Sequence, residues 1–147
     1  MREINVNDIA SNIKEMCIEA NYFLEDDIKN SLFKAEKEET SEVGKSVLNQ
    51  LNQNLDIAES EMIPICQDTG MAVVFLDIGQ DVHFVGGDLT DAVNRGVREG
   101  YEEGYLRKSV VEDPVERVNT KDNTPAIIHM NIVPGDKVKI TVSPMGF

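Results

Sequence analysis

The sequence is poor in cationic residues: 14 lysines and arginines stand against 27 aspartates and glutamates, which gives a formal net charge of −13 at pH 7. A field of this sign repels nucleic acids and anionic lipids, so neither is expected as a partner. The chain also lacks any apolar run near the ~20 residues that cross a bilayer, and its first residues lack the apolar core of a secretory signal. We therefore expect a soluble cytoplasmic protein. Its 147 residues, 41% of them hydrophobic, suffice for one domain with a core.

Cysteine is scarce as well, because only Cys17 and Cys66 are present. Two cysteines cannot form a disulfide framework, and a cytoplasmic chain keeps them reduced. They cannot complete a metal site alone, since such a site usually takes three or four protein ligands. Nucleotide-binding patterns are missing too: "GKS" at 44–46 has Glu39 where a phosphate loop needs glycine, and no strand leads into the glycines of "GVREG".

Apolar residues at helical spacing predict two helices near the N-terminus. The first carries its apolar face on residues 9–20, with Asn7 or Asp8 as the expected N-cap. The second places its apolar residues between 24 and 35, and two aspartates suit the positive N-terminal end of that helix.

A third helix is expected to follow the charged connector "EKEETSE". Thr40 or Ser41 is its expected start, and Pro64 makes helix beyond that point improbable. One face of this helix is apolar and is formed by Val43, Val47, Leu51, Leu55 and Ala58.

Strand patterns replace helical ones after Pro64. "MAVVFLDIG", residues 71–79, is typical of a buried strand, and "QDVHFV" directly after it predicts a second one. Residues 126–145 predict a strand, a turn at Pro134 and Gly135, and a further strand.

One helix interrupts the strands. Asp88 or Thr90 is its expected N-cap, and it runs from about Leu89 to Glu103 before a long loop. Three helices followed by a mixed strand–helix–strand unit favour the α+β class over a regular alternation.

The stretch "IPICQDTG", residues 63–70, is the most unusual in the chain. It places Cys66 beside an amide, a carboxylate and a hydroxyl in a loop between a helix and a strand, where functional residues concentrate. A thiolate next to Asp68 suits an iron–sulfur ligand or a nucleophile. The alternative is a small buried hydrophobe in an ordinary turn. The pattern alone leaves both open.

Three other features have structural as well as functional interpretations. Cys17 lies on an apolar helical face and is expected to be a packed core thiol. Arg107 and Lys108 form a basic pair that can hold a carboxylate, which Arg does in bidentate fashion, or can balance nearby glutamates at the surface. His83 and His129 lie in strand-like segments without metal-ligand spacing, and structural roles are expected.

The motif "IPICQDTG" followed by a short strand resembles the class I fumarate hydratases and L-tartrate dehydratases, which are oxygen-sensitive iron–sulfur hydro-lyases. The stretches "AVNRGVREGYEEGYLRKSVVEDPVERVNTKDNTPAIIH" and "IVPGDKVKITVSPMGF" are similar to the same family in the same order. The resemblance covers essentially the whole chain. It implies that this chain is the N-terminal part of an alpha subunit.

The resemblance also implies roles for individual residues. Cys66 corresponds to one of three thiolates that hold a [4Fe–4S] cluster, whose fourth iron binds substrate. Gln67 and Asp68 correspond to residues that contact the dicarboxylate substrate, and Asp68 is a candidate for proton transfer. Arg107 corresponds to an arginine that binds a substrate carboxylate.

Two properties of the family bear on what this chain does alone. The family needs two further cluster cysteines, which are expected outside these residues, and its two-component members pair this part with a beta subunit. We therefore expect residues 1–147 to be an N-terminal domain truncated at "SPMGF", helical over 1–62 and mixed over 63–147, inactive alone and part of an oligomer.

The expected reaction is the reversible hydration of fumarate to malate. The alternatives are an L-tartrate dehydratase alpha subunit, since both enzymes share these motifs, and a non-catalytic assembly or binding module that is inert alone. Sequence alone does not separate fumarate from tartrate.

Overall fold

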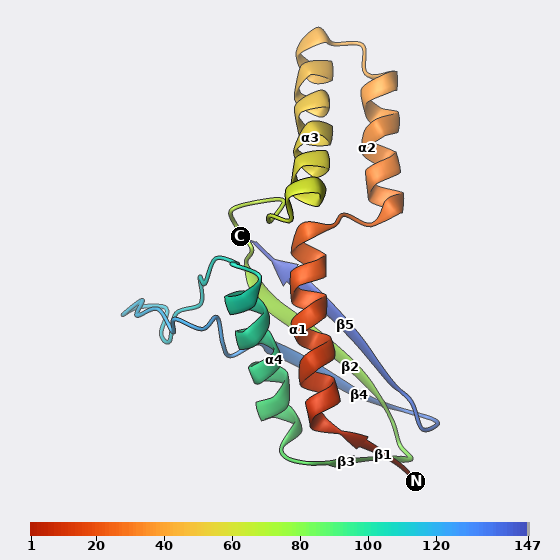
Figure 1. Ribbon diagram of the computed structural model, residues 1–147, viewed down its shortest axis with the longest axis vertical. Coiled ribbons are helices and arrows are strands. Elements are labelled where there is room, and N and C mark those ends of the chain that lie inside the picture. The colour runs from red at the N-terminus through yellow and green to blue at the C-terminus, as the bar shows by residue number, and fades with distance from the viewer. Residues whose placement is uncertain (147) are drawn as a thin grey trace.

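Helices and mixed sheets make up the computed structural model of this protein, which describes residues 1–146 and confirms the α+β class (Figure 1). In chain order the elements are β1 (Arg2–Asn5), α1 (Val6–Tyr22), α2 (Asp26–Glu38), α3 (Glu42–Glu61), β2 (Met71–Gly79), β3 (Val82–Val85), α4 (Leu89–Glu103), β4 (Ile127–Val133) and β5 (Val138–Met145).

The main sheet has three strands in the order β4-β2-β5. β4 runs parallel to β2, with Val74 opposite Ile128, and β5 runs antiparallel to it. The expected strand, turn and strand at the C-terminal end therefore exist but do not pair with each other, because β2 lies between them. Alternate residues of β2 enter the core, and these are Ala72, Val74, Leu76 and Ile78.

The core lies between this sheet and the helices α1 and α4 (Figure 1). The two helices approach closely because glycines of α4 face α1: a Cβ atom on Gly96 would lie 2.5 Å from the carbonyl oxygen of Ala10, and one on Gly100 would lie 2.9 Å from the Cβ atom of Cys17. Cys17 is fully buried here. The structure thus confirms it as a packed core thiol.

Residues 2–5 form a strand that the sequence did not predict. β1 pairs in parallel with β3, with Ile4 opposite Phe84. The predicted N-caps of the first helix are wrong for the same reason, since helix begins directly after this strand. Asn5 is the cap, and its Oδ1 accepts the N–H of Asn7 at 2.9 Å.

The helical hairpin of α2 and α3 projects from the body (Figure 1). Ser41 caps α3 as predicted, with its hydroxyl accepting the N–H of Gly44 at 3.3 Å. The apolar face of α3 is only partly covered: Leu55 and Ala58 are buried near its C-terminal end, whereas the residues farther out are exposed, namely Val43, Val47 and Leu51.

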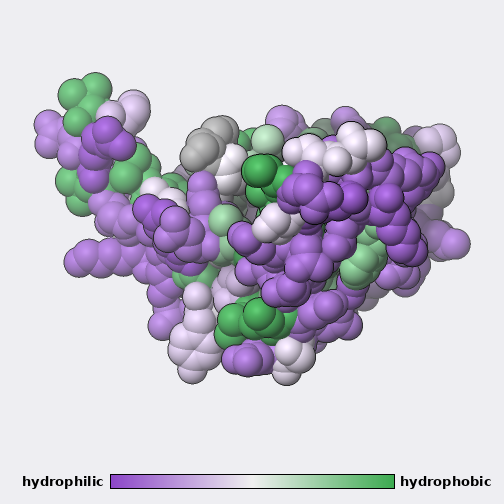
Figure 2. Space-filling model, turned by 90° about the horizontal axis from the view of Figure 1, so that it is seen from above, coloured by the Kyte–Doolittle hydropathy of each residue, from purple (hydrophilic) through white to green (hydrophobic). Residues whose placement is uncertain are grey.

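The face shown in Figure 2 is mostly hydrophilic, with small hydrophobic patches between hydrophilic residues. Asp88 caps α4, as one of the two predicted candidates, by accepting the N–H of Asp91 at 2.9 Å.

Among the described residues, no helix is both long and apolar enough to cross a membrane.

Candidate active site

The segment that carries the motif connects α3 to β2 and is anchored on two helices. The N–H of Ile65 donates to the carbonyl oxygen of Asn21 at 2.8 Å, and the side-chain amide of Asn54 donates to the carbonyl oxygen of Ile65 at the same distance. One anchor is in α1 and the other in α3. The backbone before the motif is therefore held, while Cys66 and Gln67 themselves are exposed.

Gly70 makes the turn from the motif into β2. Its φ is +61°, and a Cβ atom at this position would lie 2.1 Å from the carbonyl oxygen of Met145 at the end of β5. Both the left-handed conformation and the close approach require glycine. The carboxylate of Asp68 accepts the N–H of Gly70 at 3.2 Å, and the N–H of Asp68 points at Sγ of Cys66 at 3.4 Å.

Thr69 connects the motif to the segment that carries Arg107. It is 3% exposed, and its hydroxyl donates to the carbonyl oxygen of Arg107 at 3.0 Å. The hydroxyl of Tyr101 in α4 donates to the carbonyl oxygen of Thr69 at 2.7 Å. Burial raises the pKa of Tyr101 above its ordinary value, so this phenol keeps the proton that it donates.

Asn123 makes a second connection between the same two segments. Its amide nitrogen donates to the carbonyl oxygen of Gly70 at 3.0 Å, and its Oδ1 accepts the N–H groups of Ser109 at 2.7 Å and Val110 at 3.1 Å. The residue is fully buried and has a φ of 61°, which asparagine tolerates better than most residues. The motif and the Arg107 segment are thus one hydrogen-bonded unit.

A pocket of about 360 Å³ opens at this junction. Asp68 and Arg107, two of the four residues predicted for the site, both line it. Cys66 and Gln67 precede Asp68 directly but are not among its lining residues. The complete lining consists of Asp68, Gly70, Met71, Arg107, Ser109, Val110 and Arg117.

The basic pair at 107–108 is divided between two environments. Lys108 forms an ion pair with Glu102, as expected for a surface pair that balances nearby acidic groups. The guanidinium of Arg107 has no ion pair with any residue in the described part of the chain, and the residue lines the pocket. Of the two side chains, Arg107 is therefore the one that lines the pocket.

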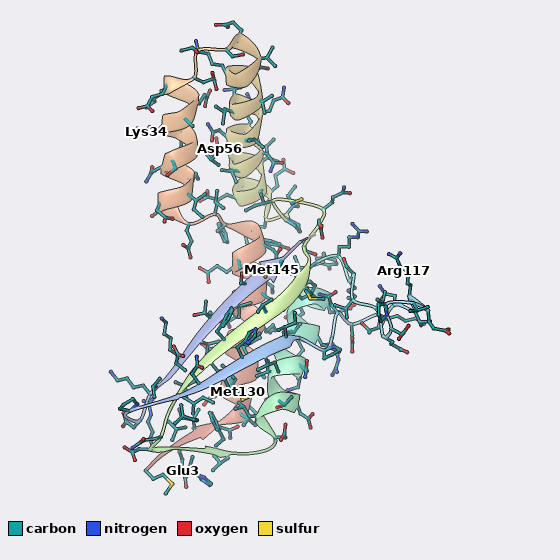
Figure 3. The ribbon with its side chains drawn as sticks, turned by 180° about the vertical axis from the view of Figure 1, so that it is seen from behind. Glu3, Lys34, Asp56, Arg117, Met130 and Met145 are labelled. Carbon is teal, nitrogen blue, oxygen red and sulfur yellow. The ribbon has the colours of Figure 1, made fainter. Side chains whose placement is uncertain are left out.

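Sequence reasoning missed Arg117 and Asn123. Arg117 lies on the projecting loop (Figure 3) and carried the same signal as Arg107, an arginine in the loop of an acidic chain. The role of Asn123 depends on contacts across long sequence separations, which no local pattern indicates.

Two larger hollows, of about 530 and 600 Å³, lie along α1 and β5. None of the predicted site residues lines either of them. We place the candidate site at the smaller pocket, because cationic and acidic side chains converge there on a loop motif.

Cys66 is the thiol that is accessible to a metal. Burial raises the pKa of the Cys17 thiol to about 12, which keeps it protonated and unsuited to ligation. Within residues 1–146, no group of three or more His, Cys, Asp or Glu side chains is placed to hold a metal ion. These residues therefore do not form a complete metal site by themselves.

Comparison with known proteins identifies the family of the chain. Residues 10–147 match the family model described as fumarate hydratase (Fumerase). The chain belongs to this fumarate hydratase family. The matched region contains the whole motif, the pocket and Asn123.

Individual relatives within the fumarate hydratase family have two kinds of name. A putative L(+)-tartrate dehydratase subunit alpha from Methanocaldococcus jannaschii is 38% identical over 116 residues, which are 78% of this chain and 40% of that protein. The aerobic class I fumarate hydratase of Escherichia coli is 43% identical over 103 residues, 69% of this chain and 19% of that protein.

An L(+)-tartrate dehydratase subunit alpha from Escherichia coli is 31% identical over 125 residues, 82% of this chain and 41% of that protein. The chain thus spans less than half the length of these fumarate hydratase family members.

Proposed function

We propose that residues 1–147 are the N-terminal part of the alpha component of an iron–sulfur hydro-lyase that hydrates fumarate reversibly to malate. The observation that carries the proposal is the shared pocket of Asp68 and Arg107, directly after Cys66 in the chain. The pocket provides a cation for a carboxylate and a carboxylate for proton transfer, at a loop that exposes a thiol. Family membership supports this reaction class.

Arg107 binds a substrate carboxylate in this proposal. Its guanidinium presents parallel N–H donors that match the two oxygens of a carboxylate. In a chain of net charge −13, such a local cation offsets the repulsion that a dicarboxylate meets. Thr69 holds the backbone carbonyl of Arg107 and so fixes where this side chain starts.

Asp68 and Gln67 contact the reacting end of the substrate. Hydration adds a proton to one carbon of the double bond and a hydroxyl to the other, so a group that moves a proton is required. Asp68 is the carboxylate in the pocket and is our candidate. Gln67 is exposed next to it and offers amide donors for a substrate oxygen.

Cys66 supplies one thiolate to a [4Fe–4S] cluster, and the other ligands come from polypeptide outside residues 1–147. When bound, such a cluster supplies a Lewis-acidic iron that polarises the hydroxyl and a carboxylate of the substrate. The exposure of Cys66 fits this role, because the thiol is open to a group completed by another part of the enzyme.

The complete enzyme in this proposal contains a beta subunit and is an oligomer. Relatives named as alpha subunits of L(+)-tartrate dehydratase support a second kind of subunit. We propose the cytoplasm as the compartment, because thiols such as the exposed Cys66 are kept reduced there. The same relatives favour one second candidate function, dehydration of L(+)-tartrate at the same site.

Steady-state assays of the assembled enzyme test this proposal. The complete alpha component and the beta subunit are reconstituted anaerobically and supplied with fumarate, malate or L(+)-tartrate. We expect Arg107→Gln and Asp68→Asn to lower kcat/KM by at least about 100-fold, because each removes a charged contact made in the transition state. Lys139→Gln and Asp77→Asn make the same charge changes on β5 and β2 and serve as controls. Equal kcat/KM values for Arg107→Gln and Lys139→Gln would contradict the proposal.

A further inference from the structure

A second guanidinium lines the pocket of Asp68 and Arg107. Arg117 belongs to the loop between α4 and β4, which projects from the body (Figure 3). It lines the same pocket as Arg107, from which ten positions of sequence separate it. We propose that Arg117 is a further substrate-binding residue, which selects dicarboxylates over monocarboxylates. This inference rests on the proposed function of the pocket.

The backbone around Arg117 is held in a tight hairpin. The N–H of Glu112 donates to the carbonyl oxygen of Val118 at 2.8 Å, and the N–H of Arg117 donates to the carbonyl oxygen of Asp113 at 2.8 Å. The carboxylate of Asp113 accepts the N–H groups of Val115 and Glu116, and these bonds lower its pKa. The position of Arg117 is therefore defined by the loop itself.

The hairpin is also tied to the segment that carries Arg107. The N–H of Thr120 donates to the carbonyl oxygen of Val110 at 3.0 Å, and the side-chain amide of Asn119 donates to the carbonyl oxygen of Lys108 at 2.8 Å. Both contacts lie within three residues of Arg117 and of Arg107. The two arginines are thereby held on one structural unit.

The charge of Arg117 is available to a ligand. Three of the five arginines donate side-chain hydrogen bonds within the protein, and these are Arg2, Arg95 and Arg98. Among residues 1–146, the guanidinium groups of Arg107 and Arg117 have no such bond and no ion pair, and both line the same pocket.

Two guanidinium groups in one pocket match a ligand with two carboxylates. A single arginine satisfies one carboxylate, and the second carboxylate of a dianion then adds to the repulsion from this acidic chain. Arg117 offsets that repulsion at the exposed side of the pocket. The ligand class that follows is a small dicarboxylate.

Arg117→Gln and Arg117→Lys in the assembled enzyme test the inference. Lys121→Gln is the matched control, because it removes one charge from the same loop at a residue that does not line the pocket. We measure KM for fumarate at low and high salt. Under the same conditions we measure the inhibition constants of succinate, which is a dicarboxylate, and of butyrate, which is a monocarboxylate. We expect Arg117→Gln to raise KM for fumarate and the inhibition constant of succinate about 5- to 10-fold. Its kcat and its inhibition constant for butyrate should stay within about twofold of the wild-type values.

Two further results are expected of a direct charge contact. Arg117→Lys keeps most of the affinity, and added salt narrows the difference between Arg117→Gln and wild type. A succinate constant for Arg117→Gln equal to that of Lys121→Gln, in an enzyme whose wild type is active, would overturn the inference and leave the proposed function standing. An assembled wild type with no hydro-lyase activity would overturn both.

Discussion

The side-chain amide of Asn123 donates a hydrogen bond to the carbonyl oxygen of Gly70 at 3.0 Å, across 53 positions of sequence. The same side chain accepts the N–H groups of Ser109 and Val110. It therefore joins the motif loop to the backbone next to Arg107. The geometry of the candidate site depends on this buried amide as much as on the residues that line the pocket.

Removal of this amide should destabilise the fold strongly. We expect Asn123→Ala to lower the free energy of unfolding by about 2–4 kcal/mol, because it leaves buried backbone groups unpaired and places alanine at a positive φ. Asn123→Asp keeps the acceptor and loses the donor, so its loss should be smaller. Denaturant unfolding of the chain measures both. Asn131→Ala, which removes an exposed hydrogen bond to Asp77, is the control, and an equal effect of the two alanine variants would refute this account.

A comparison of alanine substitutions at Gly70 and Gly135 distinguishes the cost of backbone strain from the cost of a steric clash. Both have positive φ, but a Cβ atom at Gly70 would lie 2.1 Å from the carbonyl oxygen of Met145, whereas nothing lies within 4 Å of one at Gly135. Gly135→Ala should cost about 1 kcal/mol through strain alone. Gly70→Ala should cost at least about 2 kcal/mol more, because the end of β5 must move. Equal unfolding free energies for the two variants would show that the close approach at Gly70 is wrong.

The two thiols should differ in reactivity. Cys66 is exposed, whereas burial raises the pKa of Cys17 to about 12, so its thiolate is scarce at neutral pH. A disulfide reagent added to the native chain should modify one thiol rapidly and a second only on unfolding. In Cys66→Ser the rapid phase should disappear. A rapid phase that persists in this variant would mean that Cys17 is accessible and that the packing of α1 against α4 is incorrect.

Asp122 gives a prediction for acid pH. Burial, which would raise the pKa of Asp122, is outweighed by hydrogen bonds from Thr124 and Arg98, and the pKa falls to about 2. A carboxylate whose folded-state pKa lies below its unfolded value of ~3.9 contributes stability above that value. This contribution should be lost as the pH falls from about 4 toward 2.

The difference in unfolding free energy between wild type and Asp122→Asn isolates that contribution from the other carboxylates. We expect the difference to shrink over this pH range and to stay constant from pH 5 to pH 7. A difference that does not change between pH 4 and pH 2 would contradict the lowered pKa.

Local patterns predicted most of the elements. The strand at 71–79 and the helix at 89–103 have the predicted bounds, because the short apolar run of the strand and the aspartate cap of the helix are each encoded within a few residues. The predicted N-cap of the first helix was wrong because the sequence did not predict β1. A strand of four mostly exposed residues has no apolar pattern of its own, and it forms only because β3 pairs with it.

Long-range features were beyond local patterns. The C-terminal strands look like neighbours in the sequence, yet β2 inserts between them, which a turn signal does not reveal. In the site, the family resemblance assigned Asp68 and Arg107 to the same substrate although 39 positions separate them, and both line one pocket. Arg117 reaches the same pocket through a hairpin held by its own backbone hydrogen bonds. No periodic pattern in the sequence predicts that Arg117 lines this pocket.

The central claim of the proposed function is that Cys66, two residues before Asp68 in the chain, is a ligand of an iron–sulfur cluster. Anaerobic reconstitution of the assembled enzyme with iron and sulfide, followed by the cluster absorbance band, tests the claim most directly. Wild type and Cys17→Ala are expected to hold a cluster, whereas Cys66→Ser should hold none and lose hydro-lyase activity. Cluster absorbance and activity in Cys66→Ser equal to those of wild type would contradict the account.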